Sequence, residues 1–335
     1  MVKGQTKPFA ISCGDPAGIG PEIIGKSWLQ RNNNKLNPFF AVGNIDDFHA
    51  VGRAKPIKIT EPNEAFEAFD KGLPVLDIFH GEASVLGAPT LDGAQCALHA
   101  LEVACGLARS GDAGAIITAP VSKSQLYQIG FRYPGQTEFV SERCGIAREN
   151  AVMMLAGPSL RVIPMTTHIP LKEVPQQLTQ ELVIARGKAA AKAMTRNFGI
   201  ESPRIAVAGL NPHAGENGNL GDEEKRIMQP AIDALRKTGL IITDPMPADT
   251  MFHDEARSKY DVALCPYHDQ ALIPLKTLHF FDGVNLTLGL PIVRTSPDHG
   301  TAYDIAGRDM ADPRSMIAAI QMAATAVTYR QIYDN

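Results

Sequence analysis

Three histidines stand at equivalent places in the chain, each just after a short apolar run and close to a proline. They are His168 in MTTHIPL, His213 in AGLNPHAGENG and His268 in CPYHDQ. Neutral imidazole is a common ligand of divalent metals, and three imidazoles leave coordination positions open for substrate oxygens. Asp269 is a further candidate, as a ligand, as a hydrogen-bond partner of a ligand or as a base. A hydrogen-bonded loop histidine is the alternative at each position, because residues so far apart in the chain form no local metal motif.

The segments around these histidines alternate between strand and helix patterns. Short β-branched runs predict strands at 8–14, 113–121, 160–166, 204–210 and 261–267. Ala- and Leu-rich periodic segments predict helices at 92–109, 179–198, 222–238 and 313–327, the last opened by Asp312 and Pro313. This alternation is typical of an α/β fold with largely parallel strands, whose ligands bind beyond the carboxyl ends of the strands. Because each histidine follows a predicted strand, we expect the three to converge on one site.

Composition and charge exclude several classes of function. The 335-residue chain has 44% hydrophobic residues, 20% charged residues and a net charge of −4, which predicts no nucleic-acid or membrane-surface partner. No apolar run is long enough to span a bilayer, and the N-terminal sequence lacks a signal-peptide pattern. The five cysteines show no C-x-x-C spacing, which favours reduced thiols and a cytoplasmic location. The length indicates two domains, with boundaries near 130 and near 290.

Several polar stretches follow predicted strands. CGDPAGIGPEII (13–24) is a Gly-rich turn before a helix that starts at Pro21, and its N–H groups suit an anion. Its spacing is neither G-x-G-x-x-G nor a P-loop, so a tight structural turn is the alternative. TAPVSKSQ (118–125), which contains Lys123, fits a strand exit and helix cap. YPGQTEF (133–139) places Gln136 and Thr137 after a Pro-Gly turn, where both suit contacts to a phosphate or ordinary turn positions.

The densest group of polar residues lies between 267 and 307. Lys276 and Arg294 stand there in apolar sequence surroundings, where an unpaired cation is costly. Each should therefore face an anion, which is either part of a ligand or a carboxylate of the protein.

Six sequence blocks resemble, in order, those of the 4-hydroxythreonine-4-phosphate dehydrogenase family of vitamin B6 (pyridoxine and pyridoxal phosphate) synthesis. They are GDPAGIGPE, TAPVSK, TTHIPL, GLNPHAGE, YHDQ and GVNLTLGLP-IVRTSPDHGTA, and the resemblance covers residues 8–330. HGTAYDIAG (299–307) is also similar to the adenine-binding loop of isocitrate and isopropylmalate dehydrogenases. The resemblance implies two α/β/α domains of the isocitrate/isopropylmalate dehydrogenase-like type, with an active-site cleft between them. We expect a cofactor-side domain of residues 1–130 and 290–335, and a central domain of residues 131–289 with the metal ligands and dimer interface.

The resemblance also implies roles for individual residues. One divalent metal, zinc, magnesium or cobalt, would be bound by His168 and His213 of one subunit and by His268 of the partner subunit in a homodimer. Our own hypothesis, beyond the resemblance, is that Lys276 assists proton transfer and that Asp249 or Asp269 is its acid/base partner. The implied substrate contacts are Gln136, Thr137, Lys276, Asn285 and Arg294. The implied NAD or NADP contacts are His299, Gly300, Thr301 and Asp304.

The implied reaction is metal-dependent, NAD(P)-linked oxidation and decarboxylation of 4-phosphohydroxy-L-threonine to 3-amino-2-oxopropyl phosphate. Two stretches depart from the family pattern: Gln136 stands where the family has histidine, and GENGNLGDEE (215–224) differs from the usual Gly-rich form. Activity on threonate or erythronate 4-phosphate, or on a dihydrodiol, is therefore an alternative. Two other classes are a mononuclear metal hydrolase, which has no use for an adenosine loop at 299–307, and a non-catalytic ligand-binding relative.

Overall fold

The computed structural model describes residues 7–334, which divide into two compact units. Unit 1 contains the described residues up to Ala151 together with Leu290–Val327. Unit 2 contains Val152–Gly289 together with the described residues from Thr328 onward. The divisions between the units fall after Ala151 and at 289/290, and the boundaries drawn from the sequence lie near 130 and near 290.

Residues 131–151 belong to unit 1 because their side chains pack there. The rings of Phe131, Tyr133 and Phe139 form a cluster with centroid distances of 5.1 to 5.8 Å. Nε of Arg143 donates to a carboxylate oxygen of Glu102 at 2.7 Å. The Pro-Gly turn at 134–135 interrupts the periodic pattern without ending the unit.

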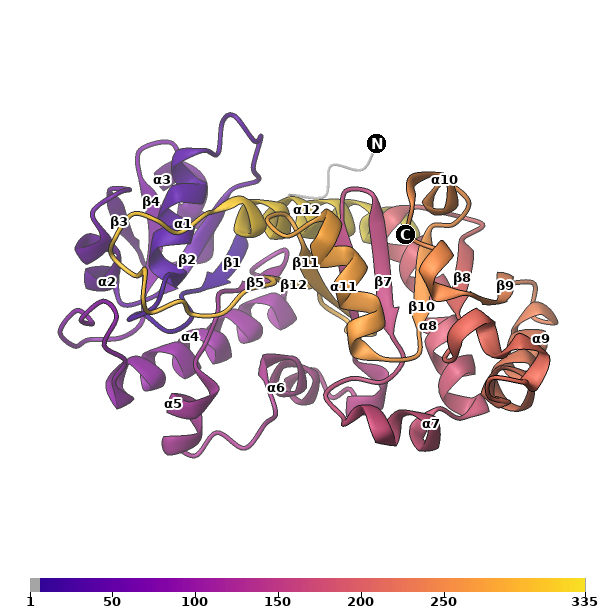
Figure 1. Ribbon diagram of the computed structural model, residues 1–335. Coiled ribbons are helices and arrows are strands. Elements are labelled where there is room, and N and C mark those ends of the chain that lie inside the picture. The colour runs from indigo at the N-terminus through magenta and orange to yellow at the C-terminus, as the bar shows by residue number, and fades with distance from the viewer. Residues whose placement is uncertain (1–6, 335) are drawn as a thin grey trace. The chain divides into compact units, whose positions relative to one another are not determined.

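Unit 1 is built on a parallel sheet flanked by helices (Figure 1). The strand order is β3-β4-β2-β1-β5-β12, and neighbouring strands run parallel. β1 and β2 are buried at every residue, as parallel strands covered on both faces should be. The strands are β1 (Phe9–Ser12), β2 (Phe39–Gly43), β3 (Pro56–Ile59), β4 (Leu73–Asp77), β5 (Ile116–Thr118) and β12 (Arg294–Pro297). The helices are α1 (Gly20–Leu29), α2 (Ile45–Val51), α3 (Ala65–Ala68), α4 (Leu91–Ser110), α5 (Lys123–Gln128), α6 (Gln136–Arg143) and α12 (Arg314–Tyr333), whose last residues fall in unit 2.

Unit 2 mixes parallel and antiparallel strands in the order β11-β6-β7-β10-β8-β9. β7, β10, β8 and β9 run parallel, whereas β6 pairs antiparallel with β7 and β11. The connection from β6 to β7 is too short for a crossover, so these two strands form a hairpin. The strands are β6 (Val152–Gly157), β7 (Leu160–Pro164), β8 (Arg204–Ala208), β9 (Ile241–Met246), β10 (Val262–Cys265) and β11 (Val284–Leu288). The helices are α7 (Val174–Gln177), α8 (Gln180–Phe198), α9 (Gln229–Arg236), α10 (Asp254–Arg257) and α11 (His268–Leu278).

Local sequence signals set the ends of the long helices. The hydroxyl of Thr90 accepts from the N–H of Gly93 at the start of α4, and Thr179 caps α8 in the same way. Both helices end at a glycine with a left-handed backbone, Gly111 and Gly199. The α/β class predicted from the sequence is therefore confirmed.

The segment predicted as one helix at 222–238 has two parts. It begins with a π-helical turn, η5 (Glu224–Met228), and continues as α9. Pro230 has no N–H to donate to the carbonyl of Arg226, which accepts from Nε2 of Gln180 at 3.2 Å instead. The ordinary α-helical pattern therefore starts only after the π-helical turn.

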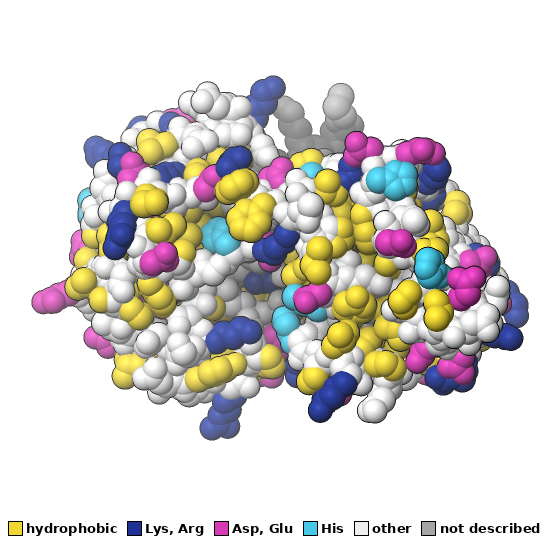
Figure 2. All heavy atoms as spheres, in the orientation of Figure 1, with side chains coloured by type: hydrophobic (Ala, Val, Ile, Leu, Met, Phe, Trp, Pro, Cys, Tyr) yellow, Lys and Arg dark blue, Asp and Glu magenta, His cyan; other side chains and the backbone are white. Residues whose placement is uncertain are grey.

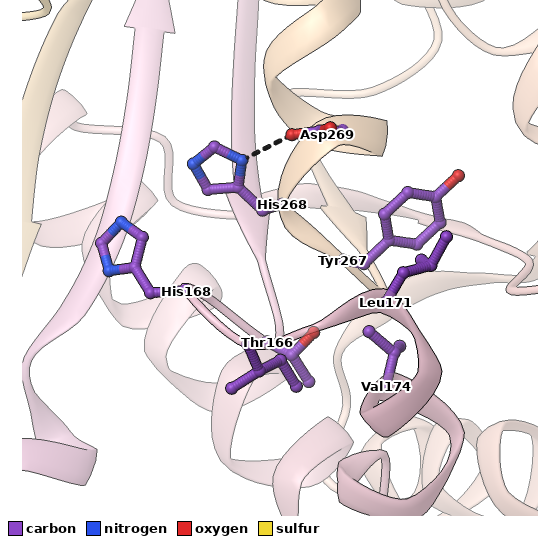
Figure 3. Close-up of a pocket in the computed structure, with 8 residues that line it drawn as sticks. Thr166, His168, Leu171, Val174, Tyr267, His268 and Asp269 are labelled. Carbon is purple, nitrogen blue, oxygen red and sulfur yellow. Dashed lines mark hydrogen bonds and ion pairs between the residues drawn. The ribbon is translucent and has the colours of Figure 1, made fainter.

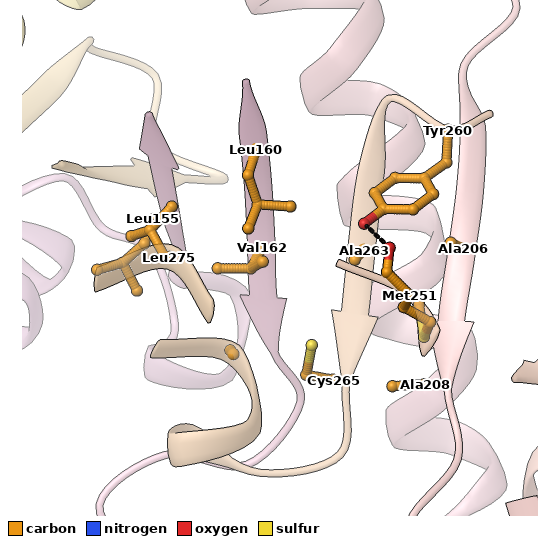
Figure 4. Packing of buried hydrophobic residues seen from close by; sticks show 11 residues of the cluster. Leu155, Leu160, Val162, Ala206, Ala208, Met251, Tyr260, Ala263, Cys265 and Leu275 are labelled. Atoms are coloured by element: carbon orange, nitrogen blue, oxygen red, sulfur yellow. Dashed lines mark hydrogen bonds between the residues drawn. The ribbon is translucent and has the colours of Figure 1, made fainter. Parts of the chain in front are cut away.

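The core of unit 2 lies between its sheet and the segments packed on it (Figure 4). Leu160 and Val162 of β7 belong to this cluster together with Ala263 and Cys265 of the neighbouring strand β10. The hydroxyl of Tyr260 donates to the carbonyl of Met251 at 2.9 Å, which satisfies the polar group of this buried ring. The core thereby fixes the strands whose carboxyl ends carry the candidate ligands.

Among residues 7–334, no helix combines the length and apolar composition that crossing a membrane requires. The five cysteines are free thiols, and Cys144 is the least buried of them.

Candidate active site

The three predicted metal ligands follow three adjacent parallel strands of unit 2. His168 comes after β7, His268 after β10 and His213 after β8, and β10 lies between the other two strands. Asp249 follows the next strand, β9, in the short helical turn η6 (Ala248–Thr250). Because the carboxyl ends of parallel strands meet at one edge of a sheet, these four residues stand at the same edge.

His168 and His268 lie side by side, with ring centroids 5.6 Å apart. Both face a pocket of about 230 Å³ at this edge (Figure 3). The other residues that line the pocket are Thr166, Ile169, Leu171, Val174, Tyr267 and Asp269.

The donor set of this pair fits a divalent metal. Nδ1 of His268 lies 2.7 Å from a carboxylate oxygen of Asp269. Donation from the Nδ1 hydrogen to this carboxylate leaves the Nε2 lone pair of His268 available, as in carboxylate–histidine–metal sites. Imidazole ligands suit Zn²⁺ and Co²⁺ in particular.

His213 does not join this pair. In residues 7–334 no group of three His, Cys, Asp or Glu side chains is placed to hold a metal ion. His213 is exposed and opens a turn in which residues 213–217 all have positive φ. The surrounding segment, η4 (Pro212–Gly218), contacts η6, so His213 lies in the neighbourhood of Asp249. The structure therefore brings together His168 and His268 within one chain, and places His213 with a different turn of the same sheet edge.

Unit 1 gathers a second polar group around Arg294, the first residue of β12. This side chain is 3% exposed, and it donates to the hydroxyls of Thr137 at 3.1 Å and Thr118 at 2.7 Å. Burial lowers the pKa of Arg294 to about 10, and the negative charge of Glu138 opposes this shift. A buried guanidinium beside two hydroxyls can bind an anionic ligand.

Gln136 and Thr137 form the start of α6, where free backbone N–H groups suit an anion. Nε2 of Gln136 donates to the carbonyl of Ala119 at 3.1 Å, and its Oε1 is buried without a hydrogen-bond partner in the described chain. Nζ of Lys123 lies 3.9 Å from the position that a Cβ on Gly135 would occupy. Lys123, which the sequence pattern placed at a strand exit, therefore adds a cation near this helix start.

The other two predicted substrate contacts belong to unit 2. Lys276 stands in the last turn of α11, with Nζ 5.8 Å from the ring centroid of Phe280. It is therefore at the opposite end of α11 from His268. Asn285 lies on β11, and its Oδ1 is buried without a hydrogen-bond partner among the residues that the structure describes. A buried amide oxygen of this kind can accept from a ligand.

The predicted cofactor loop lies in unit 1 against the Gly-rich turn that follows β1. The N–H of Ile19 donates to the carbonyl of Thr301 at 3.0 Å, and a Cβ on Gly18 would lie 2.7 Å from that carbonyl oxygen. The hydroxyl of Tyr303 donates to Asp15 at 2.6 Å. His299, Gly300 and Asp304 are exposed on this loop, where they can reach a ligand.

Asp15, Thr118 and Tyr303 were not predicted as site residues. Thr118 is the last residue of β5 and Asp15 follows the end of β1 by three residues, so position near a strand end was the available signal. The partners that make them relevant, Tyr303 and Arg294, are far away in the chain, and no local pattern links them.

Comparison with known proteins gives a consistent result. The family model of the pyridoxal phosphate biosynthetic protein PdxA matches residues 34–323. The chain is 54% identical over 327 residues to the 4-hydroxythreonine-4-phosphate dehydrogenase of Zymomonas mobilis subsp. mobilis, covering 98% of each protein. A crystal structure of the enzyme of that name from Klebsiella pneumoniae has a TM-score of 0.85 and 38% identity, covering 96% of this chain and 100% of that chain.

A more distant likeness concerns the fold alone. Isocitrate dehydrogenase from Methylococcus capsulatus has a TM-score of 0.50 and 11% identity, covering 97% of this chain and 87% of that chain. The fold type expected from the sequence is therefore confirmed. From the match along 290 of its residues and the identity along nearly all of them, the chain belongs to the PdxA family of pyridoxal phosphate biosynthetic proteins.

Proposed function

We propose that this chain is a 4-hydroxythreonine-4-phosphate dehydrogenase of pyridoxal phosphate biosynthesis. It oxidises and decarboxylates 4-phosphohydroxy-L-threonine to 3-amino-2-oxopropyl phosphate. The observation that carries the proposal is 54% identity, along 98% of both proteins, to a relative of that name. A metal hydrolase and a non-catalytic binding protein are not favoured, because the relatives described above are dehydrogenases.

The metal ligands in this proposal are His168, His213 and His268. A bound zinc, magnesium or cobalt ion would supply Lewis-acid stabilisation of negative charge on the substrate, and NAD or NADP would accept the hydride. Asp269 orients the His268 ring by its hydrogen bond to Nδ1. Support comes from the three neighbouring strand ends that carry the histidines.

The substrate phosphate binds to Arg294, Thr137 and Gln136 in this proposal. The buried guanidinium of Arg294 already bonds Thr137, and α6 begins at Gln136, so all three groups face one region of unit 1. Asn285 and Lys276 hold the rest of the substrate. Lys276, Asp249 and Asp269 are the groups for proton transfer. The loop with His299, Gly300, Thr301 and Asp304 binds the adenosine end of the cofactor.

A homodimer that shares its metal ligands completes the proposal. Exposed apolar residues follow His268 along α11 and just after it: Ile273 is 64% exposed, Phe280 66% and Phe281 50%. Hydrophobic side chains gather on the face in Figure 2 where α11 lies in Figure 1. Such a surface is typical of a protein interface. We place the enzyme in the cytoplasm, because its five cysteines are free thiols.

Two assignments share the three histidines between two chains. The family resemblance takes His268 from the partner subunit and the other two from one chain. The side-by-side rings of His168 and His268 support the other assignment, in which His213 of the partner subunit completes the site.

The decisive experiment is turnover of 4-phosphohydroxy-L-threonine with NAD⁺ or NADP⁺, followed by reduced-cofactor absorbance and release of carbon dioxide. Zn²⁺, Mg²⁺ and Co²⁺ are added separately to protein stripped by a chelator. Threonate and erythronate 4-phosphates and an aromatic dihydrodiol are run in parallel. Faster turnover of any of these compounds would assign a different substrate. If the protein turns over none of the compounds and also fails to bind NAD⁺, the dehydrogenase proposal is contradicted.

A further inference from the structure

Residues 213–217 form a left-handed helical turn. The φ angles are 53° at His213, 51° at Ala214, 44° at Glu216 and 57° at Asn217, with a glycine at 215. The left-handed conformation is unfavourable for L-residues because Cβ approaches the following carbonyl oxygen. Elsewhere in residues 7–334, non-glycine residues with positive φ are single, and one of them is His168. Strained segments of this kind persist only where the surroundings hold them, and they cluster at functional sites.

The carboxylate of Glu224 provides the contacts that hold this turn. Oε1 accepts from the backbone N–H of Asn211 at 2.7 Å, and Oε2 accepts from the side-chain amide of the same residue at 3.1 Å. The N–H of Ala214 in turn donates to the carbonyl of Asn211 at 3.1 Å. The side-chain amide of Asn211 also donates to Oε2 of Glu223 at 2.8 Å. Only Glu224 binds both the backbone and the side chain of Asn211 in these contacts, and the left-handed turn is built on that residue.

The same carboxylate packs closely against Gly215 of the turn. A Cβ on Gly215 would lie 2.7 Å from Oε2 of Glu224 and 2.8 Å from the carbonyl oxygen of Gly221. Glu224 is only 6% exposed and begins the π-helical turn η5. A buried carboxylate is energetically costly. π-Helical turns are rare in proteins overall, and those that occur are often found at functional sites. The Glu224 side chain thus supports the turn in two ways, by hydrogen bonds to Asn211 and by close packing against Gly215.

We propose that Glu224 is a positioning residue, which holds residues 211–217 in the left-handed turn and so sets the place of His213 in the metal site. This inference rests on the proposed function, in which His213 is a ligand. If the carboxylate is lost, the turn can relax toward right-handed φ values. Rotation about φ at position 213 redirects the imidazole itself, so metal affinity should depend on a residue that does not touch the metal.

The test is Co²⁺ binding to the whole protein, measured by isothermal titration calorimetry without substrate or nicotinamide cofactor. Glu224→Gln keeps the shape of the side chain but turns one acceptor into an N–H₂ group that faces N–H donors. We expect the affinity for Co²⁺ to fall by about tenfold to a hundredfold, the usual range for an outer-shell partner. Gly215→Ala places a Cβ against Oε2 of Glu224 and should displace that carboxylate, so it should also weaken Co²⁺ binding.

Asp222→Asn is the matched control. It removes one charge from the same segment, but the Asp222 side chain bonds Arg226 and is exposed. We expect wild-type affinity in this variant. Hydrogen–deuterium exchange without metal should rise in residues 209–221 of Glu224→Gln and Gly215→Ala, and remain unchanged in Asp222→Asn.

The outcomes separate this inference from the proposed function. Wild-type Co²⁺ affinity in Glu224→Gln and Gly215→Ala would overturn the inference and leave the function standing. Faster exchange throughout unit 2 would assign Glu224 a general structural role, and it would also overturn the inference. If the unmutated protein and Asp222→Asn bind no Co²⁺, the metal-dependent function fails, and the inference fails with it.

Discussion

The rings of His168 and His268 lie 5.6 Å apart in one chain, where β7 and β10 end. In the resemblance-based assignment, the His268 that completes a site belongs to the other subunit. The two assignments predict different pairs of variants that form an intact metal site in a heterodimer. Activity measurements on mixed variants can therefore distinguish them without a structure of the dimer.

The first prediction concerns mixtures of inactive variants that are allowed to exchange subunits. His213→Ala mixed with His268→Ala should regain activity, since either sharing assignment leaves one intact site per heterodimer. His168→Ala mixed with His268→Ala should recover only if His268 comes from the partner subunit. His168→Ala mixed with His213→Ala should recover only if His213 does. Recovery in no mixture, with heterodimers confirmed by native mass spectrometry, would contradict shared sites.

Arg294→Ala should raise KM for the phosphorylated substrate. The buried guanidinium bonds Thr137 and Thr118 and lies close to Glu138, so it can offer a desolvated charge to an anion. Loss of such a partner costs on the order of 2–5 kcal/mol. Steady-state kinetics and a thermal melt of the same protein check this. Unchanged kinetics with a lowered melting temperature would instead mean that Arg294 serves only the fold.

Gln136→His should improve binding of a phosphorylated substrate at low pH. Nε2 of Gln136 already donates to Ala119, and a protonated imidazole can keep that bond and offer a charged N–H to the phosphate. The difference between a charged and a neutral hydrogen bond is about 1 kcal/mol, which lowers KM several-fold. The gain should be seen at about pH 6 and fade by about pH 8, as the histidine loses its proton. An equal KM at the lower pH would show that position 136 does not face a phosphate.

Asp15→Asn should change the pH dependence of stability. Burial raises the pKa of Asp15, although bonds from Tyr303 and the N–H of Ala17 oppose the shift. Because the pKa is higher in the folded than in the unfolded chain, the stability linked to this group is present at low pH and lost as pH rises through the folded-state pKa. The free energy of unfolding of the variant, relative to wild type, should therefore increase from about pH 4 to about pH 8. Urea denaturation at both values measures it, and a constant difference would contradict the prediction.

Glu216→Gly should stabilise the protein. Glu216 is exposed with φ of 44°, so glycine removes a steric cost of about 1–2 kcal/mol and adds a smaller entropic one. Lys188→Gly is the control, because Lys188 is exposed in the middle of right-handed α8 and its loss should destabilise by about 1 kcal/mol. Chemical denaturation of both variants measures the two effects. Equal destabilisation would mean that position 216 is not left-handed in solution.

Much of the fold follows from local patterns. The strand predictions at 160–166, 204–210 and 261–267 contain β7, β8 and β10, and the helices at 92–109 and 179–198 match α4 and α8 closely. Their ends are set by Thr90, Thr179 and the glycines that follow, which are signals within a few residues. The antiparallel pairing of β6 and β11 was not predictable, because it depends on partners more than a hundred residues apart.

The candidate site is predictable in residue type more than in arrangement. A histidine at the end of a strand is visible in the sequence, and so is an arginine in apolar surroundings. That β10 lies between β7 and β8, so that His168 meets His268, is decided by strand order, which no local pattern encodes. The left-handed turn at 213–217 is equally hidden, because it contains one glycine and depends on Glu224.

Unit 1 is closed by a segment that comes after unit 2 in the chain. β12 pairs with β5, and its first residue, Arg294, reaches Thr118 and Thr137. During synthesis on the ribosome, β1 to β5 emerge well before β12, so β5 is left with an unpaired edge while residues 152–289 are made. All strands of unit 2 lie within those residues and can pair in the meantime. Translation therefore delivers the histidine-bearing sheet complete before the buried arginine arrives.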